Sequence, residues 1–127
     1  MAFQYSSTLR TNQVAQIQAT VGVSGTLKIF SGAEPANCAA ADPAGLLATI
    51  TLPAAFLTSS GGATTIAGSW TVAASGTGTA ASWRMYDGSA VCHVQGNVTT
   101  DLVLNNTSIV SGQTVTVTSF TVTAGNA

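Results

Sequence analysis

The apolar positions at the start of the chain repeat with the period of an α-helix. They lie three and four residues apart, on one side of the stretch SSTLRTNQVAQIQATVG: Val14, Ile17 and Val21. Ser6 or Ser7 can accept a hydrogen bond from an unpaired backbone N–H at the helix start, and Gly22 stands where a left-handed residue closes a helix. The pattern therefore predicts one N-terminal helix with a narrow apolar stripe.

Beyond Gly22, apolar and polar positions alternate, which is the period of a β-strand. Strands are predicted in the following segments: 26–32, 46–52, 63–75, 78–86, 90–98, 101–113 and 111–127. Between them, 33–45 has the composition of an ordered loop, 54–62 is expected to form a short turn of helix, and Asp-Gly in MYDGSA predicts a two-residue hairpin turn. Turn signals recur about every 8–12 residues, as in β-sandwiches. We therefore predict a mainly β chain, an antiparallel β-sandwich or jelly roll of seven or eight strands with one N-terminal α-helix.

The last strand changes face in its middle. In SGQTVTVTSFTVTAGNA, Val115 and Val117 have one parity, whereas Phe120 and Val122 have the other. A β-bulge explains this change, because one extra residue moves the following side chains to the opposite face. The alternative is a strand buried on both faces, in which parity carries no information.

The chain of 127 residues is short enough for one domain, and no linker interrupts it. We divide it into an N-terminal arm and helix, 1–22, and a single β-sandwich domain, 23–127.

Charge is scarce throughout the chain. Only 6% of its residues are charged, whereas 46% are hydrophobic, and the net charge is −1. Three basic residues cannot neutralise a phosphate backbone, so we expect no nucleic-acid partner. No apolar run reaches the roughly 18 residues of a membrane helix, and the opening MAFQYSSTLR is typical of a cytoplasmic start and not of a signal peptide. A surface with so little charge suits a subunit packed against other subunits.

Catalytic and metal-binding chemistry is hard to assemble from these residues. His93 is the only histidine, and its neighbour Cys92 points to the other face of a strand, so the two cannot act as a nucleophile and its base. The carboxylates are scattered, and no C-x-x-C spacing indicates zinc. We therefore expect no enzyme activity, no cofactor and no metal site.

The two cysteines and the larger aromatic side chains each allow two interpretations. Cys38 and Cys92 fit either a disulfide or two small buried side chains. Trp70, Trp83, Tyr86 and Tyr5 could form a sugar-stacking platform, and the alternative is that the tryptophans fill the core of the sandwich. A platform requires at least two of Trp70, Trp83 and Tyr86 to be exposed on one face.

Several blocks of the sequence resemble a family of small structural proteins of tailed phages and prophages. The most specific are SGAEPANCAAADPAGLLATITLP and NNTSIVSGQTVTVTSFTVTAGNA, and STLRTNQVAQIQATVG and CHVQGNV agree with them. The resemblance covers most of the chain and brings no catalytic motif. It implies a virion structural protein, assembled in the host cytoplasm.

These observations together favour a non-enzymatic capsid decoration, or cement, protein that stabilises a phage head. Its expected partners are the major capsid protein or other virion subunits, and the expected oligomer is a homotrimer. Phe3, Tyr5 and Leu9 have no local apolar partner, so they fit either an interface arm or the protein's own core. The alternatives are a tail, neck or fibre component, including a host-binding adhesin, and a carbohydrate-binding β-sandwich.

Overall fold

The structure, a computed structural model, describes residues 4–98 and 102–123. This part of the chain holds one helix, α1 (Ser7–Val21), and eleven short strands. The strands are β1 (Thr26–Phe30), β2 (Leu46–Thr51), β3 (Leu57–Ser60), β4 (Ala63–Ile66), β5 (Thr71–Ala73), β6 (Gly78–Thr79), β7 (Ser82–Tyr86), β8 (Cys92–Asn97), β9 (Leu102–Leu104), β10 (Ser108–Ile109) and β11 (Thr114–Thr123). The predicted class, mainly β with an N-terminal helix, is confirmed.

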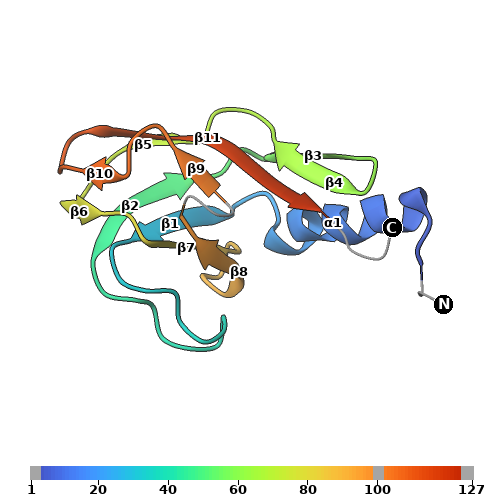
Figure 1. Cartoon of the computed structure of the whole chain (residues 1–127), viewed down its shortest axis with the longest axis horizontal. Coiled ribbons are helices and arrows are strands. Elements are labelled where there is room, and N and C mark those ends of the chain that lie inside the picture. The colour runs from blue at the N-terminus through green and yellow to red at the C-terminus, as the bar shows by residue number, and fades with distance from the viewer. Residues whose placement is uncertain (1–3, 99–101, 124–127) are drawn as a thin grey trace.

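The strands form three antiparallel sheets in a sandwich-like arrangement (Figure 1). The first sheet has the order β2-β1-β7-β8. The second has the order β3-β4-β11-β5, with β9 also paired to the long strand β11. The pair β10-β6 is the third. The strand number exceeds the predicted seven or eight because several strands are only two or three residues long, too short to show a period in the sequence.

The helix forms where it was predicted, and its ends are capped as expected. Ser6 Oγ accepts a hydrogen bond from Leu9 N–H at 3.1 Å, and Gly22, at φ 79°, donates its N–H to the Gln18 carbonyl at 2.9 Å. Of its apolar stripe, Val14 and Val21 are buried and Ile17 packs against the core. The helix is therefore docked on its own domain.

The hairpin β3–β4 replaces the turn of helix expected at 54–62. Gly61 and Gly62 both have positive φ, at 60° and 79°, and they reverse the chain between the two strands. Two polar side chains of α1 then tie the hairpin to the helix: Gln18 Oε1 accepts from Leu57 N–H at 2.7 Å, and Thr11 Oγ1 accepts from Gly62 N–H at 2.8 Å. The Gly-Gly pair was the sequence signal for this hairpin, and the prediction of a helical turn was wrong.

A bulge in β11 accounts for its change of face. The register against β9 shifts between Val117 and Ser119, so that Val115, Val117 and Phe120 are all buried although their parities differ. The Thr and Ser residues between them are exposed or half-buried. The bulge interpretation is confirmed, and the alternative of a strand buried on both faces is wrong.

Four large aromatic side chains form a continuous contact through the core. The Trp83 ring meets Phe120 edge-on at 5.1 Å, Phe120 lies 5.6 Å from Trp70, and Trp70 lies 6.0 Å from Phe56. Because Trp83 belongs to the first sheet and Phe120 to the second, these contacts join the two layers.

Candidate functional site

The loop 31–45, which we call the cover loop, lies against the face of the first sheet that points away from the core. Strand β7 is buried at all five positions, Ser82 to Tyr86. Trp83 and Met85 belong to the core. Arg84 and Tyr86 alternate with them along the strand and therefore point to the other face. Ser82 Oγ donates to the Gly32 carbonyl at 2.7 Å. The cover loop therefore shields side chains that an uncovered sheet would expose to water.

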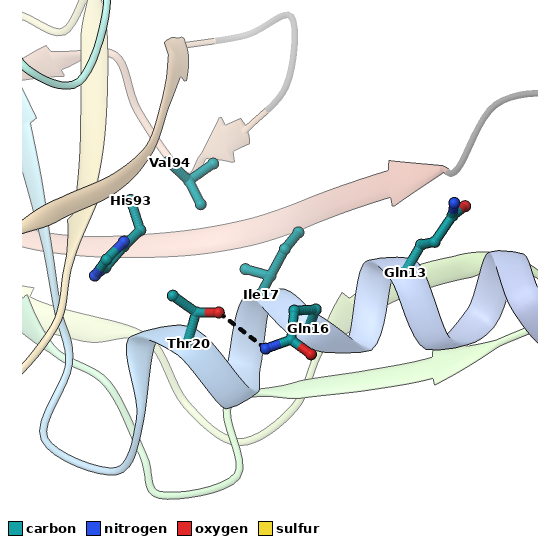
Figure 2. Close-up of a pocket in the computed structure, with 6 residues that line it drawn as sticks. All are labelled: Gln13, Gln16, Ile17, Thr20, His93 and Val94. Atoms are coloured by element: carbon teal, nitrogen blue, oxygen red, sulfur yellow. Dashed lines mark hydrogen bonds between the residues drawn. The ribbon is translucent and has the colours of Figure 1, made fainter.

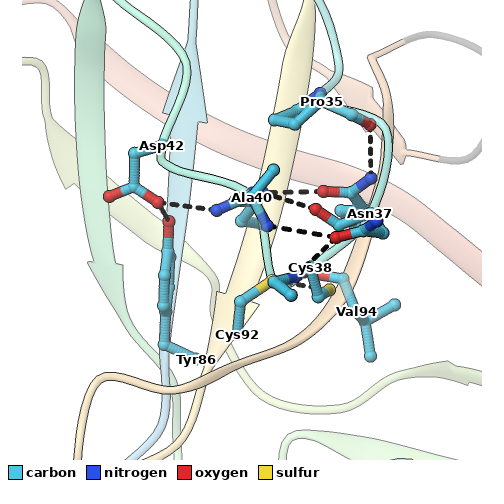
Figure 3. Close-up of polar contacts among 11 residues, drawn as sticks. Pro35, Asn37, Cys38, Ala40, Asp42, Tyr86, Cys92 and Val94 are labelled. Carbon is cyan, nitrogen blue, oxygen red and sulfur yellow. Dashed lines mark hydrogen bonds and ion pairs between the residues drawn. The ribbon is translucent and has the colours of Figure 1, made fainter.

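Arg84 is the centre of this arrangement. Its side chain is 2% exposed, and its guanidinium makes three hydrogen bonds. Nη1 donates to Asp42 Oδ1 at 2.9 Å, and Nη2 donates to the Asn37 carbonyl at 2.9 Å, both on the cover loop. Nε donates to Gln95 Oε1 on β8 at 3.2 Å. Gln95 Nε2 in turn donates to the Pro35 carbonyl at 2.7 Å, so β7 and β8 both hold the loop (Figure 3).

Asp42 and Tyr86 complete the polar cluster. The Tyr86 hydroxyl donates to Asp42 Oδ1 at 2.5 Å. Partial burial would raise the pKa of Asp42, but the hydrogen bonds from Tyr86 and Arg84 outweigh it and hold that pKa below the ordinary value of 3.8. Burial, followed by the hydrogen bond to Asp42, raises the pKa of Tyr86. Lys28 Nζ lies 4.9 Å from the Tyr86 ring centroid, so two of the three basic residues gather here.

The structure brings Cys38, on the cover loop, against Cys92, at the start of β8. Cys38 Sγ and Cys92 Sγ are 2.7 Å apart, and both side chains are half-buried thiols (Figure 3). Burial, and then the contact with Cys38, raises the pKa of the Cys92 thiol. The geometry agrees with the disulfide, one of the two interpretations that the sequence left open, and the bond itself stays a prediction.

His93 is held on the other side of β8. Its Nε2 lies 2.8 Å from Asp87 Oδ2, while Asp87 Oδ1 accepts from the N–H groups of Ser89 and Val91. The hydrogen bond to His93, followed by those from the two N–H groups, lowers the pKa of Asp87. Asp87 therefore organises a loop between Tyr86 and Cys92 that is longer than the predicted two-residue Asp-Gly turn.

Beside His93, helix α1 and strand β8 border a shallow hollow of about 250 Å³ (Figure 2). Its lining residues are Gln13, Gln16, Ile17, Thr20, His93 and Val94. Gln16 Nε2 is engaged with Thr20 Oγ1 at 3.1 Å. The lining presents amides, an imidazole and the Thr20 hydroxyl, which is bonded to Gln16, and it contains no thiol and no carboxylate. It can offer hydrogen bonds to a bound group, but it is not a catalytic constellation.

Trp70, Trp83 and Tyr86 do not form an aromatic platform for a sugar. Trp70, Trp83 and Tyr86 are 1%, 2% and 4% exposed, whereas stacking on a sugar requires an open ring face. The two tryptophans lie in the core, as one interpretation predicted, and the Tyr86 hydroxyl donates its hydrogen bond to Asp42. The structure therefore contradicts the requirement that the carbohydrate-binding alternative placed on these residues.

The predicted interface arm is only partly described. Phe3 lies outside the described residues, Tyr5 is half-buried, and Leu9 is 45% exposed on the outer side of α1. The helix that carries Leu9 packs on the protein's own hairpin, so Leu9 projects from a rigid support. A contact of these residues with another subunit stays a prediction.

Sequence reasoning missed the Arg84 cluster. It described the carboxylates only as scattered, and it gave Asp42 and Arg84 no role. A signal was present: in SWRMY a lone arginine stands between large apolar residues, and such a position requires a partner that covers it. The partner lies 42 residues away and could not be identified without the fold.

Within residues 4–98 and 102–123, no group of three or more His, Cys, Asp or Glu side chains is placed to hold a metal ion. No helix in this part of the structure has the length and apolar character needed to cross a membrane. Comparisons of the chain with protein-family models, with curated proteins and with solved structures found no match.

Proposed function

We propose that this chain is a non-enzymatic structural subunit of a tailed-phage virion, and specifically a capsid decoration protein bound to the major capsid protein. The observation that carries the proposal is the character of its surface. Few charges face the solvent, and several large apolar side chains do. Such a surface is poorly suited to a free monomer and well suited to permanent packing.

Several of the seven charged side chains have partners within the molecule. Arg84 is buried, Asp42 is bonded to it, and Asp87 is paired with His93. The exposed large apolar side chains are 40–72% exposed: Leu9, Val23, Leu46, Val91, Val103 and Val110.

The fold and the resemblance support the same proposal. A small sandwich joined through the aromatic contacts of its core is a rigid unit that can bridge capsid subunits without changing shape. The resemblance of two long sequence blocks to virion structural proteins supports a place for this chain in a phage particle. The proposed assembly is a homotrimer, because closed cyclic symmetry lets one surface patch be used repeatedly at a symmetric junction of the shell.

The test is cryo-electron microscopy of particles of the phage or prophage that encodes the chain. Density for the sandwich at the three-fold and quasi-three-fold positions of the head is the expected result. Density confined to the neck, tail or fibres would replace the decoration role with that of a tail or fibre component. Particles of complete composition that lack the chain would overturn the proposal.

A binding assay tests the contact made by the N-terminal segment. Particles prepared without this chain are mixed with the purified protein and sedimented. Leu9→Asp should abolish co-sedimentation, because it places a charge in an apolar contact. Thr8→Asp is the matched control, since Thr8 is the neighbouring exposed residue of the same helix and the same charge is introduced. Binding of both variants at the level of the natural chain would exclude Leu9 from the contact.

A further inference from the structure

Cys38 is held in place by its neighbours on the cover loop. Asn37 Oδ1 accepts hydrogen bonds from the N–H groups of Ala39 and Ala40, at 2.9 and 3.1 Å, so the chain turns around Cys38. The Asn37 carbonyl is bonded to Arg84, as described above. These hydrogen bonds therefore hold the backbone at Cys38 without any bond to Cys92.

Cys92 reaches the same place because β8 contains a bulge. The register against β7 shifts between Met85 and Tyr86: Met85 opposes Val94, but Tyr86 opposes Cys92, so His93 is the extra residue. Without the bulge, His93 would stand opposite Tyr86. The bulge turns Cys92 toward the cover loop and leaves His93 beside α1 (Figure 2, Figure 3).

The pair is open to small reagents. Cys38 and Cys92 line a surface hollow of about 420 Å³, together with Asp42 and Val91. Both sulfurs belong to half-buried residues, so a small molecule can reach them, and each sulfur already lies 2.7 Å from the other. This short distance favours reaction within one chain over cross-linking between chains.

We propose that Cys38 and Cys92 form a reversible intramolecular disulfide by exchange with a low-molecular-weight disulfide, and that this bond holds the cover loop against the first sheet. The inference concerns the chain alone and does not depend on its proposed function. It assigns the pair a redox role, whereas the sequence left it open between a disulfide and two buried side chains.

The reaction with glutathione disulfide takes two exchange steps. In the first step, one cysteine thiolate attacks a glutathione sulfur, the glutathione S–S bond breaks, and one glutathione thiolate leaves. In the second step, the other cysteine thiolate attacks the protein sulfur of the mixed disulfide, and the second glutathione leaves. The two protons lost by the protein thiols end on two glutathione thiols. The protein loses two electrons and glutathione disulfide gains them.

The test uses the full chain, reduced and then incubated in glutathione buffers of increasing disulfide fraction. The intact mass should fall by the mass of two hydrogen atoms, and a peptide containing Cys38 linked to one containing Cys92 should appear. Oxidation should raise the thermal midpoint by about 10 °C or more, because the bond closes a long loop. Stable glutathione adducts on both cysteines, or cross-linked dimers in place of the internal bond, would overturn the proposal.

Single and double variants separate the bond from other effects of oxidation. Cys38→Ser and Cys92→Ser should each take up one glutathione without the rise in midpoint, and the double variant should not respond to oxidation. If a variant fails to fold, the mass and peptide measurements on the natural chain still decide whether the bond forms.

Restraint of the loop has its own measurement, which is amide hydrogen exchange of peptides from residues 31–45. Oxidation should slow exchange across the cover loop several-fold, since the loop must open to expose its amides to exchange. Equal exchange in the reduced and oxidised chains would show that the bond does not hold the loop.

Discussion

Replacing Arg84 with methionine tests whether this one side chain holds the cover loop in place. The change keeps an unbranched apolar stem but removes the charge and all three hydrogen bonds of the guanidinium. The carbonyl of Asn37 and the side chain of Gln95 lose a donor. Asp42 keeps only the bond from Tyr86. We therefore expect the loop to loosen and the protein to lose stability.

The magnitude follows from the exposure of the partners. Hydrogen bonds that involve a charged group contribute about 1.5–3 kcal/mol each, and breaking a buried ion pair costs about 3–5 kcal/mol. Asp42 is 45% exposed, so water replaces part of what it loses. Methionine also gains some apolar burial where Arg84 was. The lower end of the range applies, and the expected loss in the free energy of unfolding is about 3 kcal/mol.

The assay is urea unfolding of the reduced protein, followed by the fluorescence of the two buried tryptophans. Lys28→Met is the matched control, because Lys28 stands beside Arg84 in the register of β1 against β7 and also loses a positive charge. Its contact with the Tyr86 ring contributes about 0.5–1 kcal/mol. If R84M and K28M unfolded within about 1 kcal/mol of each other, the guanidinium would not be the anchor of the loop.

Other predictions address the core, the helix and the response to pH. Phe120→Ala should lower the free energy of unfolding by about 3–5 kcal/mol in urea, because its ring joins the two sheets, whereas Thr121→Ala on the exposed face should change it by about 0.5 kcal/mol or less. Ser6→Ala should lower it by about 1 kcal/mol in thermal unfolding, through loss of the helix cap. The lowered pKa of Asp42 contributes stability above its ordinary value of 3.8 that is lost as the pH falls through the lower, folded-state value, and Asp42→Asn should remove that part of the acid transition. The raised pKa of Tyr86 contributes stability that is complete below 10.0 and lost as the pH rises further, so Tyr86→Phe should flatten the alkaline side of the midpoint-against-pH curve.

Periodic segments with distinct ends were predictable from the sequence. The helix has three apolar residues on one face and a residue suited to each cap, so its position followed from the pattern. The bulge of β11 was also visible, because apolar residues mark the buried face on both sides of the slip. Strands of two or three residues could not be seen, since their existence depends on a partner strand and not on their own pattern.

The candidate site was harder to predict, because its parts are brought together by tertiary structure. Cys38 and Cys92 were singled out by counting, but counting does not give their distance. The Arg84–Asp42 bond joins residues on two separate elements. The bulge of β8 was invisible, because in the sequence Cys-His-Val only valine is clearly apolar, so no change of parity marks the extra residue.

The positions of α1 and the cover loop relate the two proposals to each other. The helix borders β8 on the side of Val94 and His93, whereas the cover loop meets the opposite side of the same strand through Cys92. A contact with a capsid through Leu9 therefore leaves the cover loop free, and oxidation of the cysteines should not alter binding that depends on Leu9. If oxidation changed the affinity for particles while L9D did not, the docking surface would be the cover loop, and the disulfide would act on attachment itself. Which of the two changes, oxidation or L9D, alters the affinity for particles thus identifies the face of the sandwich that meets the shell.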